Sequence, residues 1–224
     1  MTALFITSTG TDIGKTFVMA GLIRHLRRAG RPVEAIKPIV SGFDPAQAVV
    51  SDPGVLLAEL GRTATPEEIE RISPWRFDAA LSPDLAAARE GRALDFDALV
   101  EFSRQALAAH KGTLLIEGVG GVMVPLDGRR TVLDWMTVLR VPVLLVAGSY
   151  LGAISHTLTA LHVLAQRKLD IAATVVSESV GSPVTLDDTV AIIERFSSGI
   201  EVIGIPRLAA GADHMAFGRI GRLL

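Results

Sequence analysis

Residues 3–16 read ALFITSTGTDIGKT, and this stretch decides the fold. Its apolar beginning, Ala3–Thr7, predicts a buried β-strand, and the amphipathic residues Lys15–Ala29 predict a helix soon after it. A glycine loop joins the two and ends in Gly14-Lys15-Thr16. A strand, a glycine loop and a helix in this order are the context of a phosphate-binding loop. The usual spacing places a glycine at position 9, where this chain has Thr9, and Gly10 follows it.

The chemistry of such a loop explains its residue types. Glycines let backbone N–H groups face the phosphates, and the helix N-terminus adds partial positive charge. We expect Lys15 to meet the terminal phosphates and Thr16 to help to hold Mg²⁺. A glycine turn with a solvated lysine is the alternative for Gly14-Lys15-Thr16 alone, but the flanking strand and helix favour nucleotide binding.

The rest of the chain alternates short apolar runs with amphipathic stretches, as βαβ units do. More strands are expected at Val33–Lys37, Leu114–Glu117, Val143–Val146, Ala172–Val176 and Val202–Ile205. More helices are expected at Phe96–His110, Ala153–Lys168 and Leu186–Phe196, with Asp95 and Thr185 as N-caps and Gly30 closing the first helix. The pattern predicts an α/β fold: a P-loop NTPase-type, doubly wound, mainly parallel sheet with helices on both faces. We expect residues 1–224 to form a single domain with a helical insertion at about 40–112.

Composition narrows the function to small-molecule chemistry. The formal net charge of -2 gives no general attraction to nucleic acid or to an anionic membrane. The chain has no cysteine, which excludes thiolate catalysis and Cys-based metal sites. The histidines show no metal-ligand spacing, which argues against zinc, although His156 lies near the expected ligand crevice. The N-terminus lacks the pattern of a signal peptide, so we expect a cytoplasmic location.

Two charged residues end expected strands, where ligands bind in doubly wound sheets. Lys37 would add a cation near phosphates; an ordinary exposed lysine is its alternative. Glu117 ends a strongly apolar strand, and a metal ion would account for a buried acid there; capping of the next glycine turn is its alternative. Asp52 is a weaker candidate, since Ser51-Asp52-Pro53-Gly54 predicts a turn. The glycine run 118–121 lacks the G-x-G-x-x-G spacing of a Rossmann dehydrogenase.

Several motifs occur together in the order found in dethiobiotin synthetases. The matching segments are Thr9–Thr16, Lys37–Gly42, Ser82-Pro83, Glu90–Arg92, Glu117–Gly121, Pro125-Leu126, Asp134-Trp135, Pro142-Val143 and Leu151–His156. The chain resembles this family from its first strand to about Pro206. The series is more specific than any one of its motifs.

This resemblance implies an ATP-dependent ligase of biotin biosynthesis that acts as a homodimer. In the family, an amine of 7,8-diaminononanoate takes up CO₂, ATP phosphorylates the carbamate, and the second amine displaces phosphate to close the cyclic urea. Mg²⁺ is the implied cofactor, with ATP as co-substrate. Lys15, Lys37 and Mg²⁺ would neutralise charge on the transferred phosphoryl group.

The family's site residues carry over by position. The implied metal ligands are Thr16, Asp52 and Glu117, which makes Asp52 a site residue. The implied catalytic residues are Thr11, Lys15 and Lys37. Nucleotide contacts are implied for Asp12, Ile13, Gly14, Lys15, Thr16, Phe17, Ser177, Pro206, Arg207 and Leu208. Substrate contacts are implied for Ser41, Gly120, Leu151, Gly152 and Ser155, with Leu151–Ser155 approaching substrate across the dimer interface.

Two positions depart from the family pattern. Well-known members have Asn-Asp after the fifth strand, to hydrogen-bond the adenine, whereas this chain has Ser177-Glu178-Ser179. We therefore expect weaker discrimination between ATP and other triphosphates, with Glu178 or the backbone around Pro206–Leu208 substituting. Ser155 stands where some members have Asn, so its hydroxyl would bond substrate less firmly.

Two other functions fit a phosphate-binding loop. A dimeric P-loop switch or partitioning ATPase shares this fold, but such proteins usually carry an extra lysine early in the loop, where this chain has Thr9-Gly10-Thr11-Asp12. The second is an amidoligase-like enzyme that acts on a larger acid. The short chain, with neither a glutaminase domain nor a cysteine, argues against it.

Overall fold

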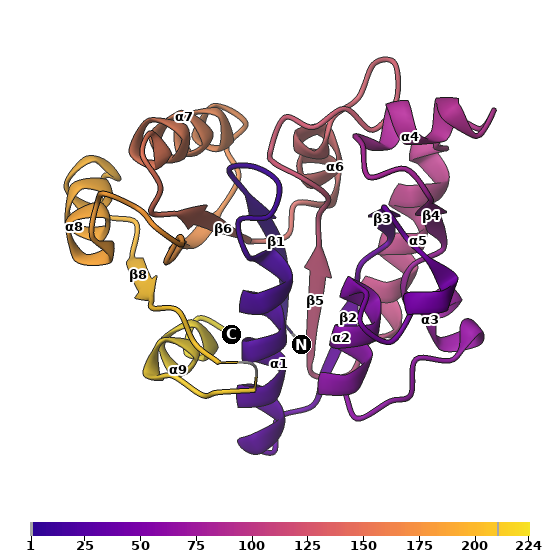
Figure 1. Ribbon diagram of the computed structural model, residues 1–224, viewed down its shortest axis with the longest axis horizontal. Helices are drawn as coiled ribbons and strands as arrows, with labels where there is room; N and C mark the ends of the chain where they lie inside the picture. Colours follow the sequence, from indigo (N-terminus) through magenta and orange to yellow (C-terminus); the bar gives the residue numbers. More distant parts are fainter. Residues whose placement is uncertain (1, 210) are drawn as a thin grey trace.

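The protein forms a parallel sheet between two layers of helices (Figure 1). The computed structural model describes residues 2–209 and 211–224. Among these residues the main sheet has six strands in the order β2-β5-β1-β6-β7-β8, and all neighbouring strands are parallel. The strands are β1 (Thr2–Ser8), β2 (Val33–Ile36), β5 (Thr113–Glu117), β6 (Val143–Gly148), β7 (Ile171–Ser177) and β8 (Val202–Ile205). The expected strands and the doubly wound parallel sheet are confirmed.

Side chains that alternate along the strands create two cores, one on each face of the sheet. On one face, Leu4 and Ile6 pack in a cluster with α1 (Lys15–Arg28) and α9 (Met215–Gly221). On the other face, Phe5 meets Trp135 of α6 (Val132–Leu139) edge to face, with ring centroids 4.8 Å apart. This second face is also covered by α5 (Phe96–Ala109), α7 (Ala153–Gln166) and α8 (Leu186–Phe196).

The segment between β2 and β5 builds one flank of the molecule, on the right of Figure 1. Before α5 it contains β3 (Ile39–Ser41), η1 (Pro45–Gln47), α2 (Asp52–Glu59), α3 (Pro66–Ile72), β4 (Trp75–Phe77) and α4 (Pro83–Arg89). The turn expected at Ser51–Gly54 is wrong, because Ser51 caps α2 and Pro53 stands in its first turn. Serine followed by proline favours the start of a helix as well as a turn, so these four residues alone do not separate the two.

The capping residues lie where the sequence places them. Asp95 Oδ1 accepts the backbone N–H groups of Asp97 and Ala98, each at 3.0 Å. Thr185 caps α8 in the same way, and Gly30 follows α1 with a positive φ of 69°. These three predictions are confirmed. In the described part of the chain, no helix is long and apolar enough to cross a membrane.

The C-terminal segment packs against the first helix. Phe217 of α9 is fully buried, and a Cβ on Gly21 of α1 would lie only 2.1 Å from its ring. The absence of a side chain at Gly21 therefore allows α9 to pack closely against α1. This contact accounts for the position of α9 (Met215–Gly221), which the sequence does not predict.

Candidate active site

The glycine loop lies at the carboxyl end of β1, where the chain turns into α1. Asp12 and Gly14 have positive φ angles of 57° and 103°, and such left-handed residues allow the loop to fold back toward the helix N-terminus. A Cβ on Gly121 would come within 3.1 Å of Gly10 N and 3.2 Å of Ser8 O. The loop is thus held against the glycine turn that follows β5.

Lys15 is buried beneath this loop, with 7% of its surface exposed. Its Nζ donates to Gly120 O at 2.8 Å and to Ser8 Oγ at 3.1 Å. Burial lowers the pKa of Lys15 to about 8; Glu117 opposes this shift and Lys37 adds to it. The ammonium donates its hydrogen bonds to neutral oxygens. A phosphate within its reach would give it a charged oxygen as partner.

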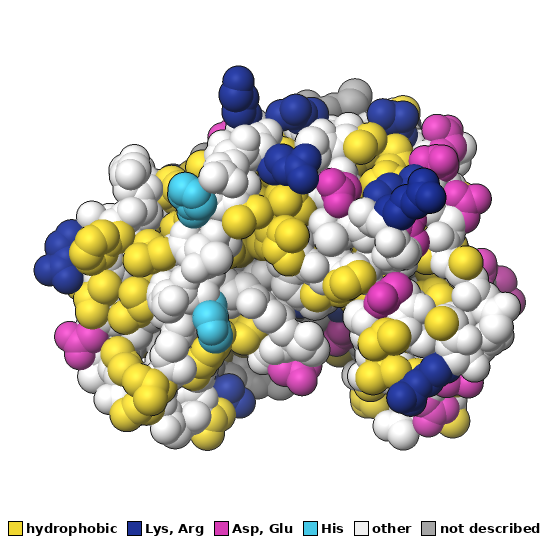
Figure 2. Space-filling model, turned by 90° about the horizontal axis from the view of Figure 1, so that it is seen from above, with side chains coloured by type: hydrophobic (Ala, Val, Ile, Leu, Met, Phe, Trp, Pro, Cys, Tyr) yellow, Lys and Arg dark blue, Asp and Glu magenta, His cyan; other side chains and the backbone are white. Residues whose placement is uncertain are grey.

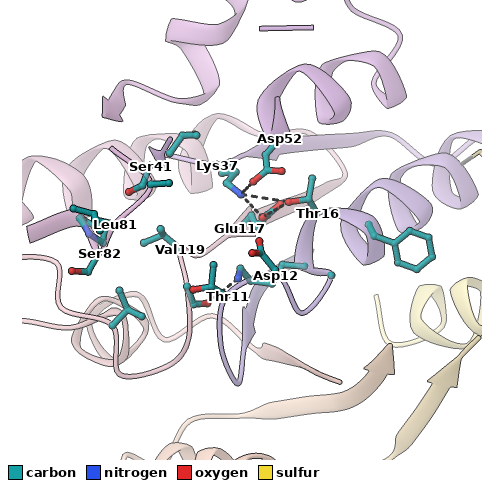
Figure 3. A pocket seen from close by; sticks show the side chains of 18 residues that line it. Thr11, Asp12, Thr16, Lys37, Ser41, Asp52, Leu81, Ser82, Glu117 and Val119 are labelled. Carbon is teal, nitrogen blue, oxygen red and sulfur yellow. Dashed lines mark hydrogen bonds and ion pairs between the residues drawn. The ribbon is translucent and has the colours of Figure 1, made fainter. Parts of the chain in front are cut away.

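Lys37 lies at the centre of a second group of charges (Figure 3). Its Nζ donates to Glu117 Oε1 at 2.7 Å and forms an ion pair with Asp52. Thr16 Oγ1 donates to the same Glu117 oxygen at 2.7 Å. Side chains from α1, from β5, from the residue after β2 and from the start of α2 therefore converge beside the glycine loop.

The surroundings of Lys37 fix its charge. Lys37 and Glu117 are 5% and 1% exposed. Burial alone would lower the pKa of Lys37, but the charges of Glu117 and Asp52, and hydrogen bonds to both, outweigh it and raise the pKa above its ordinary value. Lys37 therefore keeps its proton at neutral pH and serves as a cation.

The second oxygen of the Glu117 carboxylate has no such contact. Glu117 Oε2 is buried and has no hydrogen-bond partner among the described residues. An unpaired buried carboxylate oxygen is costly. With the Thr16 hydroxyl and the Asp52 carboxylate close by, it belongs to a set of hard oxygen donors that suits a divalent cation.

One cavity of about 580 Å³ joins these groups. The predicted site residues that line it are Thr11, Asp12, Gly14, Lys15, Thr16, Phe17, Lys37, Ser41, Asp52, Glu117 and Gly120. Ser41 Oγ is buried and has no hydrogen-bond partner in residues 2–209 and 211–224, so it is available to a ligand. The structure thus brings together the loop, the two lysines and the two acids that the sequence singles out.

Other predicted site residues lie outside this lining. Ile13 packs at the edge of the core around α1. Leu151, Gly152 and Ser155 lie at or just before the start of α7, and Leu151 is 76% exposed. Within the described part of one chain, the fold does not place these three with the other predicted substrate contacts.

The residues predicted to contact the nucleoside lie around the ends of β7 and β8. Ser177 adjoins the glycine loop, since a Cβ on Gly14 would come within 3.0 Å of Ser177 Oγ. Glu178 Oε2 accepts the backbone N–H of Arg207 at 2.8 Å. The Glu178 N–H donates to Ile205 O at 2.9 Å. Glu178 thus ties the segment after β7 to Pro206–Leu208.

The sequence did not reveal the largely apolar wall of the cavity. This wall consists of Val40, Ala80, Leu81, Ser82, Pro83, Val119 and Val124. Isolated apolar residues in an irregular segment have no periodicity that marks them as a site. The available signals are the family's motifs: Ser82-Pro83 begins α4 beside this wall, and Val40 and Val119 stand within the matching segments Lys37–Gly42 and Glu117–Gly121.

Comparison with known proteins places the chain in a family. A family model described as an AAA domain matches residues 2–210. The ATP-dependent dethiobiotin synthetase BioD of Methylobacterium nodulans is 50% identical over 213 residues, which cover 92% of this chain and 94% of that protein. The protein of the same name from Caulobacter sp. strain K31 is 48% identical over 221 residues, covering 96% and 94%. The chain belongs to the dethiobiotin synthetase family. This confirms the resemblance read from the motifs.

Solved structures support the fold. A chain of the MinC:MinD cell division protein complex of Aquifex aeolicus aligns with a TM-score of 0.56 at 15% identity, covering 99% of this chain and 86% of that one. A ParA family ATPase from Chlorobium tepidum aligns with a TM-score of 0.54 at 13% identity, covering 92% and 84%. At these identities the likeness concerns the fold alone.

Proposed function

We propose that this member of the dethiobiotin synthetase family forms dethiobiotin from 7,8-diaminononanoate, CO₂ and ATP, as a ligase of biotin biosynthesis. The observation that carries the proposal is the convergence of Lys15, Lys37 and Glu117 on one cavity beside the glycine loop. Phosphoryl transfer depends mainly on positioned cations and on charge stabilisation, and this cavity offers both.

We assign Mg²⁺ to Thr16, Asp52 and Glu117. Hydroxyl and carboxylate oxygens are the donors that Mg²⁺ prefers, and Glu117 Oε2 is a buried acceptor without a partner among the described residues. When bound, the metal would supply positive charge against the phosphate oxygens of ATP.

The reaction needs three bond-forming steps that the charged end of the cavity suits. A substrate amine attacks CO₂ and loses a proton, which leaves a carbamate. A carbamate oxygen attacks the terminal phosphorus of ATP, and ADP leaves. The second amine attacks the activated carbonyl carbon and loses a proton, phosphate leaves and the ring closes. Lys15 and Lys37 would stabilise the charge that builds up on the transferred group, and Lys37 does so as a permanent cation.

The other parts of the site fit the remaining ligand groups. Ser41, Thr11 and Gly120 line the same cavity and are assigned to the substrate's reacting end. The apolar wall that includes Leu81 and Val124 suits the hydrocarbon chain of the substrate. The loop residues Asp12–Phe17 are assigned to the phosphates of ATP, and Ser177 with Pro206–Leu208 to its nucleoside.

A homodimer would complete this site. Leu151, Met123 and Leu85 are 76%, 57% and 55% exposed, and burial of Leu151 against a second copy would remove its apolar surface from water. Figure 2 views the molecule from above and shows a hollow between two lobes, with hydrophobic side chains exposed on both. We assign Leu151, Gly152 and Ser155 to the substrate bound by the partner subunit. In this assignment residues 1–224 act as one domain, whose insertion at about 40–112 supplies Ser41 and Asp52.

Labelled carbon dioxide tests this function directly. The protein is incubated with diaminononanoate, MgATP and carbon-13 bicarbonate, and the products are examined by mass spectrometry. We expect dethiobiotin that carries the label in its ring carbonyl, together with ADP and phosphate. ATP hydrolysis without this product, stimulated instead by a protein partner, would favour a switch ATPase.

A further inference from the structure

Two serines continue the contact between β6 and β7 beyond the point where the strands end. The backbone N–H of Ser149 donates to Ser179 Oγ at 3.0 Å, and the backbone N–H of Ser179 donates to Ser149 Oγ at 2.9 Å. The hydroxyl oxygen of each serine thus accepts a hydrogen bond from the backbone N–H of the other. We call this reciprocal pair the serine clasp.

The surroundings of the clasp hold it in one arrangement. Ser149 is buried, with 1% exposed, and its carbonyl accepts the hydroxyl of Ser182 at 2.5 Å. A Cβ on Gly148 would come within 2.8 Å of Ser179 Oγ, so only glycine leaves the hydroxyl in place. The clasp therefore fixes the segment after β7 to the end of β6 through a close contact of buried and half-buried groups.

The clasp acts on the segment that adjoins the glycine loop. Ser177, two residues before Ser179, lies beside Gly14, the N-cap of α1, since a Cβ at that position would come within 3.0 Å of the Ser177 hydroxyl oxygen. Glu178 stands between Ser177 and Ser179, and its carboxylate accepts a hydrogen bond from the backbone N–H of Arg207 at 2.8 Å. The segments after β6, β7 and β8 are consequently joined in one frame beside the loop. β5, with Glu117, and β2, which leads into Lys37, lie on the other side of β1.

We propose that Ser179 and Ser149 are positioning residues for the nucleotide, and that the clasp holds Ser177 and the Pro206–Leu208 segment in their nucleotide-binding places. This inference rests on the proposed function, because the acids and lysines on the β2–β5 side are there assigned to metal, phosphate and substrate. The remaining place for the nucleoside of ATP is the side of the sheet that carries β7 and β8. A preformed frame lowers the cost of ordering these segments when nucleotide binds.

Binding of ADP, measured by titration calorimetry without turnover, tests the clasp. Ser179→Ala should weaken ADP binding by roughly fivefold to tenfold, because the free energy of about one hydrogen bond that holds the segment in place is lost. Ser179→Thr keeps the hydroxyl and should restore most of the affinity. In steady-state assays, Ser179→Ala should raise KM for ATP and leave kcat at saturating ATP near that of the unmodified enzyme.

Three further variants separate the positioning of the nucleotide-binding segment from a general loss of stability. Ser149→Ala removes the other half of the clasp and should weaken ADP binding similarly, and the double variant should lose little more than either single one. Thr185→Ala removes the cap of α8 near the same segment, which should reduce stability but leave ADP affinity unchanged.

Two outcomes would overturn the clasp. One is unchanged ADP affinity in both Ser179→Ala and Ser149→Ala, and the other is an equal loss of affinity in Thr185→Ala. The proposed function fails separately, if the unmodified protein binds ADP but forms no dethiobiotin. In that case the ADP titrations still report on the clasp.

Discussion

Substitution of Lys15 should lower the rate of the reaction and have little effect on the stability of the fold. Among the described residues, its ammonium donates hydrogen bonds only to oxygens of Ser8 at the end of β1, of Gly10 in the glycine loop and of Gly120 in the next glycine turn. We expect Lys15→Ala to lower kcat/KM by roughly 10²–10³-fold, because a cation that stabilises the transferred phosphoryl group is lost. Steady-state kinetics and thermal unfolding measure the two effects. Lys111→Ala, an exposed lysine far along the chain, is the control. Near-normal turnover in Lys15→Ala would remove the catalytic role.

Glu117 carries the test of the metal assignment. Glu117→Gln keeps the shape of the side chain and removes its charge, so the Mg²⁺ concentration at half-maximal rate should rise by roughly tenfold or more. Lys37 keeps Asp52 as a charged partner, which helps the variant to remain folded. Glu34→Gln on the neighbouring strand β2 should leave the Mg²⁺ dependence unchanged. An identical Mg²⁺ requirement in both variants would show that Glu117 is no metal ligand.

At this scale the sequence predicts charged residues better than apolar ones. Lys15, Lys37 and Glu117 stand at strand ends or helix starts, and the topology of a parallel sheet brings such positions together. Only the family pattern predicts Asp52 as a metal ligand, since its local sequence indicates a turn as readily as the start of a helix. Val124 and Leu81 could not be found, because their role depends on which segments face one another across the cavity.

Among the elements, α9 packs against α1 and is expected to stabilise the helix that follows the glycine loop. Phe217 is fully buried against α1, the helix that begins at the glycine loop. We expect Phe217→Ala to lower the free energy of unfolding by about 3–5 kcal/mol, from lost burial and from the cavity left behind. Urea denaturation monitored by circular dichroism measures this.

Phe217→Leu is the matched control for α9. It keeps most of the apolar volume and should cost clearly less than Phe217→Ala. A loss of stability below about 1 kcal/mol in Phe217→Ala would mean that α9 contributes little to the folded state.

The elements themselves follow from local patterns, and their contacts do not. The ends of α5 and α8 are set by Asp95 and Thr185, whose side chains satisfy nearby N–H groups within their own segments. The fit of Phe217 over Gly21 joins residues almost two hundred positions apart, and neither residue type indicates it alone. The serine clasp is hidden for the same reason, since serines in two separate loops resemble ordinary turn residues.

At the scale of the whole molecule, the proposed homodimer builds each complete site from two chains. Lys15 belongs to the cavity of its own chain, whereas Leu151 is exposed and is assigned to the partner's substrate. We expect Lys15→Ala and Leu151→Asp to be poorly active when each is prepared alone. A mixed dimer of the two should regain activity, because one of its sites then has both Lys15 and Leu151 intact.

Subunit exchange followed by a turnover assay measures this recovery. Sedimentation velocity shows whether each preparation is a dimer, so that a failure to associate is recognised. Two variants of the same chain position, such as Lys15→Ala with Lys15→Met, provide the control and should not complement each other. Absence of recovery in demonstrably mixed dimers would place Leu151 outside the site.

The most direct test of the proposed ligase activity is the coupling of ATP cleavage to ring formation. ADP and dethiobiotin are quantified in the same reaction, with diaminononanoate and bicarbonate each supplied or withheld. We expect equal amounts of ADP and dethiobiotin when both are present, and little ADP when either is missing. Steady ADP production that is independent of the diamine, with no dethiobiotin, would contradict it.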